Sequence, residues 1–286
     1  MRQGESADAG ESVYSASFVY ERQDRIYVDS RPRPEFDNLM GLHTLRLSLI
    51  LRGQWSLGAR LLGELQLPGT YLYNDATSNP QFVRLLGLGD AMALFHFRLA
   101  RAAVADESDD HEAPARRVHG LASVGLRLPT GSIEGQDSTG RRATEETLQL
   151  GTGRPAGVAG GSVFFALGKK TSLFGSVLGR LSLGETKYRY HYGAGMQATA
   201  GGEILAGDSW SFSLTAACLY AAPDRFEDDV AESTGRTDVQ IGPGVAWSAS
   251  RNLTVRFSAL AQVVTRVHGL QLVTPVAATL SLAWRR

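Results

Sequence analysis

The sequence predicts an all-β chain that folds as a transmembrane antiparallel up-and-down β-barrel of about twelve strands. Three observations predict it: apolar and polar residues alternate strictly, the alternating segments are long, and their polar faces carry charged side chains at mid-strand. The chain has 286 residues, of which 43% are hydrophobic and 20% are charged, so it is too apolar for a disordered chain. No run approaches the roughly 18 uninterrupted apolar residues of a spanning helix, which excludes a helical membrane protein.

The alternation begins clearly at Thr44. Leucine occupies every second position from 45 to 51, and Arg46, Ser48, Ile50 and Arg52 alternate with these leucines. The pattern resumes after Gly53 and Gln54, where we expect a tight hairpin turn. Two weaker segments, 12–22 and 156–168, bring the expected number of strands to about twelve. The clear segments are 44–52, 55–67, 90–99, 118–128, 172–183, 188–199, 210–220, 238–248, 253–263 and 271–284.

Segment length separates a membrane barrel from a soluble barrel or sandwich, the alternative fold. These segments run about 11 to 15 residues, whereas soluble strands average about 5 to 6 and about 9 to 11 tilted residues cross a bilayer. Charged residues at mid-strand must stay hydrated while the apolar face must be covered, and lipid outside with water inside satisfies both. Aromatic residues near the ends of the apolar faces are typical of interfacial girdles: Trp55, Tyr188, Tyr190, Trp210, Phe212, Tyr220, Trp247 and Trp284.

The connections between the segments alternate in length, as expected when short turns face the periplasm and long loops face outward. Two brief connections near 184 and 269 and a long acidic one, 105–116, break the rule. Within the longest loop we expect a short helix over 139–150, which would narrow the pore if it folds inward. The short connections are 53–54, 169–170, 207–209 and 250–252, and the long ones are 23–40, 68–87, 130–155 and 223–236.

The chain is expected to form one domain, with a flexible N-terminal segment over 1–11 and a single barrel over 12–286. Residues 1–10 lack the apolar core of a secretory signal, so we expect a removed signal peptide and a location in the outer membrane. The 29 basic and 29 acidic residues balance, which argues against a nucleic-acid binder.

Three short stretches resemble a known family. They are GLGD at 87–90, LRLPTGS at 126–132 and LGTG at 150–153, and they follow one another in this order. Together they resemble the outer-membrane barrel family named for the MetA pathway of phenol degradation, over about residues 85–284. The resemblance implies an outer-membrane transporter, loosely linked to hydrophobic or aromatic compounds, and it implies no catalytic motif.

The polar faces of the predicted strands carry more basic than acidic residues. We hypothesise that the lumen prefers anionic or electron-rich solutes, because arginines can bind carboxylates bidentately. In the alternative reading, arginine and glutamate pair across strands and fill a narrow lumen. The candidate lumen and solute-path residues are Arg46, Arg60, Glu64, His96, Arg98, Arg127, Arg180, Arg189, His191 and Arg256.

The sequence therefore predicts an outer-membrane channel for the diffusion of small solutes, anionic or aromatic, through a basic lumen. The alternative is a non-conducting barrel that acts as a sheath or docking partner for another envelope protein. A surface lipid hydrolase is a third class, and His43, Asp37 and Ser48 are the residues that could form its site. We expect no enzyme, because no histidine has an obvious nucleophile partner in the sequence.

No cofactor and no metal site are expected. The single cysteine, Cys218, excludes cysteine-based metal motifs, and the acidic stretches 106–112 and 227–232 lack the spaced ligands of a calcium loop. The expected partners are the lipids of the outer membrane and small-molecule solutes, with no nucleic acid. Another envelope protein would be a partner only in the sheath alternative.

Overall fold

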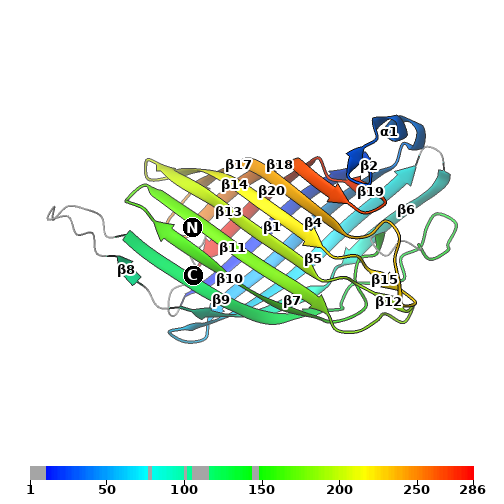
Figure 1. Cartoon of the computed structure of the whole chain (residues 1–286). Helices are drawn as coiled ribbons and strands as arrows, with labels where there is room; N and C mark the ends of the chain where they lie inside the picture. The colour runs from blue at the N-terminus through cyan, green and yellow to red at the C-terminus, as the bar shows by residue number, and fades with distance from the viewer. Residues whose placement is uncertain (1–10, 77–78, 100–101, 105–115, 144–147) are drawn as a thin grey trace.

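A closed antiparallel barrel accounts for most of the chain in the computed structural model (Figure 1). The structure describes residues 11–76, 79–99, 102–104, 116–143 and 148–286. Pairing of β20 with β1 and of β9 with β10 closes the barrel. Its strands are β1 (Ser12–Gln23), β4 (His43–Ser56), β5 (Leu61–Ala76), β6 (Asn79–Leu88), β7 (Ala91–Arg98), β9 (Arg116–Leu128), β10 (Ala156–Ala166), β11 (Thr171–Ser182), β13 (Gly195–Ala206), β14 (Trp210–Ala221), β17 (Arg236–Ser248), β18 (Leu253–Val267) and β20 (Val276–Arg285).

Strands β6 and β7 form one interrupted strand, because both pair with β5, β6 along its second half and β7 along its first. Counted in this way, the barrel has twelve strands, and the predicted fold class and strand number are confirmed. The two weak segments that were predicted as strands are β1 and β10.

Small elements decorate the two ends of the barrel. In Figure 1, β8 (Ala102–Val104) lies at one end of the barrel, which we call the short-turn end. The labelled small elements at the opposite, long-loop end are α1, β2, β19, β12 and β15. No helix in the described part of the chain is long and apolar enough to span a membrane. The remaining elements are β2 (Arg25–Val28), β3 (Arg31–Pro32), α1 (Pro34–Met40), β12 (Tyr190–His191), β15 (Arg225–Phe226), β16 (Asp229–Val230) and β19 (Leu270–Val273).

The two faces of the wall differ as the alternation predicts. Large apolar side chains point outward around the barrel, and Leu214 and Phe257 leave 60% and 47% of their surface exposed. A contiguous apolar surface of more than a few hundred Å² is rare on soluble monomers. Serine, threonine, glutamine and charged residues occupy the inner face, for example Ser17, Thr199 and Gln240. The outer face is therefore a surface for lipid, and the barrel is of the transmembrane kind.

All four tryptophans lie near the short-turn end and form part of a girdle. The indole Nε1 of Trp55 donates a hydrogen bond of 3.2 Å to the Tyr14 hydroxyl. Trp210 and Trp247 are register partners on β14 and β17, and their rings stack with 6.1 Å between centroids. The fourth, Trp284, lies 6.2 Å from the Tyr14 ring. This part of the predicted girdle is confirmed.

Four sequence-based expectations about the connections are wrong or lie outside the described residues. Strand β4 runs through Gly53 to Ser56, since Gly53 makes room for the Trp55 ring, which would lie 2.6 Å from an added Cβ. The turn falls at 57–60 instead.

Much of 68–87 is not a loop, because β5 and β6 form a long hairpin there. The strand expected from 188 begins only at Gly195, so Tyr188 and Tyr190 belong to a loop and not to a girdle. The acidic connection is described only at residue 116.

Lipid exposure of β14 gives a test of the orientation of the wall. Replacing Leu214 with Arg is expected to destabilise the folded barrel in the bilayer by about 2 to 4 kcal/mol, because the guanidinium would enter hydrocarbon. Ser176→Arg, on the lumen face of β11, is expected to cost much less. Denaturant titration of the protein in lipid vesicles, followed by tryptophan fluorescence, measures both. Equal costs for the two variants would contradict this orientation.

Candidate functional site in the barrel lumen

Seven of the ten candidate lumen residues lie on the inner face of the wall, and three do not. Arg60 lies in the exposed turn after β4. Arg189 lies in the loop after β11, where it has a positive φ of 58° and pairs with Glu227, and His191 belongs to β12 in the same loop. The expectation that these three line strands is wrong, because the hairpin turn and the start of β13 lie elsewhere than predicted. The inward residues are Arg46, Glu64, His96, Arg98, Arg127, Arg180 and Arg256.

Glu64 is the centre of a closed polar network on the inner face. Its side chain is 1% exposed and accepts hydrogen bonds from Arg52 at 2.5 Å and from Gln54 at 2.7 Å. Gln66 donates to its other oxygen at 2.5 Å, and His96 Nε2 lies 2.9 Å from Oε2. The carboxylate is thus satisfied by four side chains from three adjacent strands, β4, β5 and β7. This part of the lumen follows the alternative reading, in which opposite charges pair across strands.

The network continues to Ser123 on β9, whose Oγ lies 2.8 Å from His96 Nδ1. The order serine, histidine, carboxylate is that of a hydrolase triad. Ser123 nevertheless lies in a regular strand that pairs on both sides, with β7 and with β10. The ladder uses the backbone N–H groups that an oxyanion would need, so the arrangement links strands and lacks an oxyanion hole.

The predicted surface triad does not assemble. His43 Nδ1 lies 3.3 Å from the carbonyl oxygen of Gly41, and Asp37 accepts a hydrogen bond from the backbone of Ile26. Ser48 shares a hydrogen bond with Thr70 on the lumen face. Among the residues that the structure describes, no group of three or more His, Cys, Asp and Glu side chains could hold a metal ion.

Asp90 is the second buried carboxylate, and it sits at the interruption between β6 and β7. Its side chain is 1% exposed and pairs with Arg127 at 2.8 Å. Oδ1 accepts a hydrogen bond from the backbone N–H of Gly131, and Oδ2 accepts from both the N–H and the hydroxyl of Thr152. The GLGD, LPTG and LGTG stretches therefore meet at one point, where Asp90 holds both ends of the loop 129–155.

Two further contacts fix this junction. Thr130 Oγ1 accepts a hydrogen bond from Ala91 N–H and donates one to the Gly89 carbonyl, each at 2.8 Å, so it bridges the gap in the strand. A Cβ added to Gly131 would lie 2.6 Å from the Cα of Gly151. The two ends of the loop can approach this closely only because both positions are glycine.

Loop 129–155 folds inward over the β5–β6 hairpin. Leu72 and Val83, on the inner face of the hairpin, pack with Ala143 and Leu148 of the loop, and Leu72 is completely buried. Val83 also forms an isolated bridge with Asp137. The expected helix over 139–150 falls in part on residues 144–147, which lie outside the described residues; residues 139–143 form turns and a bridge, and Leu148 has a 3-10 helical conformation. The loop nevertheless covers the inner side of the wall at the long-loop end, as an inward fold requires.

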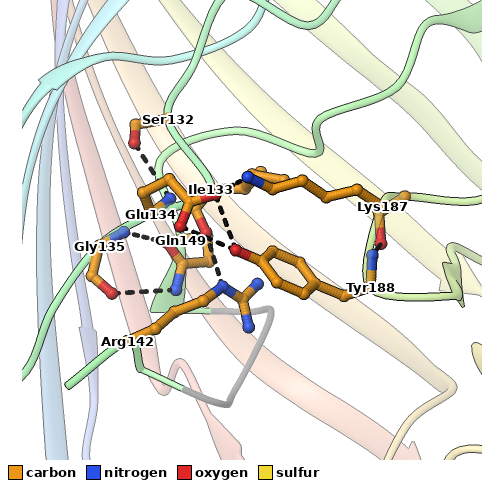
Figure 2. A network of polar contacts seen from close by, with 9 residues as sticks. Ser132, Ile133, Glu134, Gly135, Arg142, Gln149, Lys187 and Tyr188 are labelled. Carbon is orange, nitrogen blue, oxygen red and sulfur yellow. Dashed lines mark hydrogen bonds and ion pairs between the residues drawn. The ribbon is translucent and has the colours of Figure 1, made fainter.

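A second set of contacts ties this loop to the loop between β11 and β13 (Figure 2). The Tyr188 hydroxyl donates to Glu134 at 2.8 Å, and Lys187 pairs with the same carboxylate. The Arg142 guanidinium lies 3.8 Å from the centre of the Tyr188 ring. The ammonium of Lys187 lowers the pKa of Glu134 below its ordinary value of 4.5, and Glu134 raises the pKa of Lys187 above 10.5. The contact is therefore ionic over a wide range around neutral pH.

The wall is incomplete beside β6. This strand pairs with β5 on one side, and on its other side the described residues provide the isolated Val83–Asp137 bridge and two hydrogen bonds between Phe82 and Ser138, but no neighbouring strand. Leu86 and Leu88 point outward from it with 81% and 64% of their surface exposed. Between Asp90 and the long-loop end, the barrel is thus bounded by loop 129–155 instead of by a neighbouring strand.

Two further inward carboxylates are also paired. Glu203 accepts a hydrogen bond from Ser211 at 2.5 Å and lies 3.7 Å from Arg256. Asp238 accepts from Gln262 and Thr265 and pairs with Arg236 at 3.2 Å. The pattern of polar and apolar residues could not find the hub at Asp90. The glycine and threonine residues of the three short stretches were the available signal.

The sequence matches no family model and no curated protein. Among solved structures, an outer membrane channel from Pseudomonas putida F1 is similar over 100% of both chains, with 12% identity and a TM-score of 0.76. The translocator domain of an autotransporter from Neisseria meningitidis shows 10% identity over 99% of this chain and 89% of that chain, with a TM-score of 0.46. A toluene transporter from Ralstonia pickettii shows 10% identity over 97% of this chain and 90% of that chain, with a TM-score of 0.37. The first match shows that the chain has the fold of an outer-membrane β-barrel, as the family resemblance implies.

The Glu64 network predicts a large stability loss on truncation of its acceptor. Glu64→Ala would leave the buried side chains of Gln54 and His96 without their acceptor and is expected to lower the free energy of unfolding by about 1 to 3 kcal/mol for each of them. Glu11→Gln removes a carboxylate from a half-exposed pair with Arg285 and is expected to cost about 1 kcal/mol or less. Denaturant titration in lipid vesicles compares them, and similar costs would show that the network adds no stability.

The tie between the two loops predicts a pH dependence. Because the pKa of Glu134 is lowered, its contribution to the stability of this contact is fully present above pH 4.5 and is lost as the pH falls through the lowered pKa. Because the pKa of Lys187 is raised, its contribution is present below 10.5 and is lost as the pH rises through the raised value. Between these limits, Glu134→Gln is expected to speed deuterium exchange of residues 132–136, after correction for intrinsic rates.

The matched control for this measurement is Glu227→Gln, which removes the partner of Arg189 and leaves Glu134 in place. Its exchange over residues 132–136 should equal that of the unmodified protein. Unchanged exchange in Glu134→Gln at neutral pH would mean that the tie does not hold the loops together.

Proposed function

We propose that the protein is an outer-membrane channel for the diffusion of small solutes, with aromatic and other apolar molecules as the preferred class. The observation that carries the proposal is the closed twelve-strand barrel, which matches an outer membrane channel over the full length of both chains. The apolar outer face and the tryptophans at the short-turn end support its insertion in a bilayer.

The inner face supports apolar solutes better than a general preference for anions. The inward carboxylates Glu64, Asp90, Glu203 and Asp238 each pair with an arginine, so four of the inward arginines are neutralised. Two apolar side chains of β11, Phe174 and Leu178, project inward and are only partly buried, so they offer contact to an uncharged solute.

Loop 129–155 is the part of the wall that we infer to move. Since β6 is bonded to one strand only, displacement of the loop breaks no barrel ladder, whereas opening at another place would break a continuous one. The solute would then pass between the lumen and the region beside β6, where the outward surface is apolar. Asp90 and Arg127 would act as the fixed end of this movable segment.

Locking the loop tests the proposal. Residues in an antiparallel bridge lie about 4.5 to 5.5 Å apart at Cα, which suits a disulfide. In a Cys218→Ser background, Val83→Cys with Asp137→Cys should form a bond that fixes the loop on β6. Oxidation is expected to lower uptake of the apolar aromatic dye N-phenyl-1-naphthylamine by Gram-negative cells that express the protein, and a membrane-permeant reductant should restore it.

The control lock is Ser17→Cys with Ser281→Cys, which joins register partners on β1 and β20 away from the loop. Its oxidation should leave dye uptake unchanged. Equal uptake by the oxidised and reduced loop lock would refute movement of the loop. Uptake no greater than that of cells without the protein would refute the channel itself and favour a non-conducting barrel.

A further inference from the structure

Arg180 faces inward near the long-loop end of β11 and is exposed to the lumen. Within the described part of the chain it forms no ion pair and no hydrogen bond, whereas Arg127 and Arg236 pair with Asp90 and Asp238. Arg98, which also lacks an ion pair among these residues, donates a hydrogen bond to the Ala59 carbonyl. The exposed guanidinium of Arg180 is therefore available to a ligand.

The positions next to Arg180 in its row across the strands carry small residues. Its register partner on β13 is Gly195, and a Cβ added there would lie 2.5 Å from the Nε of Arg180, so the side chain lies across the glycine. The next positions in the same row are Ala221 on β14 and Arg236 on β17. Two small residues therefore separate the two arginines on the inner face.

The surrounding charges do not neutralise Arg180. Arg127 and Arg236 are close enough to repel its guanidinium, and Asp224 is the carboxylate that attracts it. Asp224, however, already accepts hydrogen bonds from the Tyr190 hydroxyl at 2.5 Å and from the Gly193 N–H at 2.7 Å. Asp224 is thus held by these donors and forms no ion pair with Arg180 among the described residues, which leaves the guanidinium free to bind an anion.

Apolar side chains lie on the other side of Arg180. Val158 on β10 is its direct register partner, and Leu178 precedes it by two positions on the same face of β11. Leu178 lies across Gly160, since its Cδ1 would be 3.0 Å from an added Cβ. Val158 is buried, whereas Leu178 is only partly buried, so a solute held by the guanidinium can place an apolar body against Leu178.

We propose that Arg180 and Leu178 form a binding site for a small apolar acid with one carboxylate, such as an aromatic carboxylate. The planar guanidinium matches one carboxylate bidentately, and a dianion would require a second unpaired cation, which Arg127 and Arg236 do not supply. The site lies near the long-loop mouth of the lumen, where it would select solutes that enter. This inference rests on the proposed channel function and names a solute class for it.

The test compares benzoate with its neutral isostere benzamide and with acetate, which lacks the apolar body. Binding to the full chain in lipid nanodiscs is measured by calorimetry, and uptake and ionic current are measured in vesicles and planar bilayers. We expect benzoate to bind at least about tenfold more tightly than either comparison compound, as one charge-assisted bidentate contact allows. Arg180→Gln should remove this preference for benzoate over benzamide, and Arg180→Lys should restore part of it.

The control variant is Arg22→Gln, which removes the same charge from the outward face, where Arg22 pairs with Asp24. It should bind benzoate as the unmodified protein does. Equal affinity of the Arg180→Gln variant and the unmodified protein for benzoate, with both folded and conducting, would overturn the inference and leave the channel intact. Absence of current and of benzamide uptake in the unmodified protein would instead overturn the channel function.

Discussion

The constraint on which this structure depends is that backbone polar groups have no water to bond in the hydrocarbon of a bilayer. A sheet can meet it only by closing on itself, so that each strand bonds two neighbours. Here β20 returns to β1 and β9 joins β10, and the ladder is continuous around most of the wall. The alternation of side chains follows from closure, because one face of every strand then meets lipid and the other meets the lumen.

The wall departs from this rule at one place, beside β6, and the chain compensates there with a loop. Asp90 lies where the strand is interrupted and bonds both ends of loop 129–155, while Thr130 bridges the gap itself. Leu72 and Val83 then bury their side chains under the loop. A buried carboxylate is costly, but here an arginine, a hydroxyl and two backbone N–H groups satisfy it. Glu64, Glu203 and Asp238 are paired with arginines in the same way, whereas Arg180 forms no ion pair among the described residues.

The short family-like stretches acquire a physical meaning from this junction. GLGD supplies the carboxylate, LPTG supplies Thr130 and the first glycine, and LGTG supplies the second glycine and Thr152. They are far apart in the sequence but form one contact, in which two glycines allow the backbones to approach. The resemblance thus reflects a way of anchoring a loop as much as a way of building a barrel.

The sequence by itself determined the fold class, the strand number and the side of the wall on which most residues lie, because a period of two depends only on the pleat of a strand. It also predicted that aromatic residues form a girdle and placed seven of the ten lumen candidates on the inner face. It misplaced Arg60, Arg189 and His191, since local pattern cannot tell a strand from a turn when a glycine such as Gly53 serves packing. Only the tertiary structure decided which charges pair, that the described part of loop 129–155 packs on β6, and that Arg180 forms no ion pair with any residue that the structure describes. These features depend on contacts between strands and loops distant in the sequence, which periodicity does not encode.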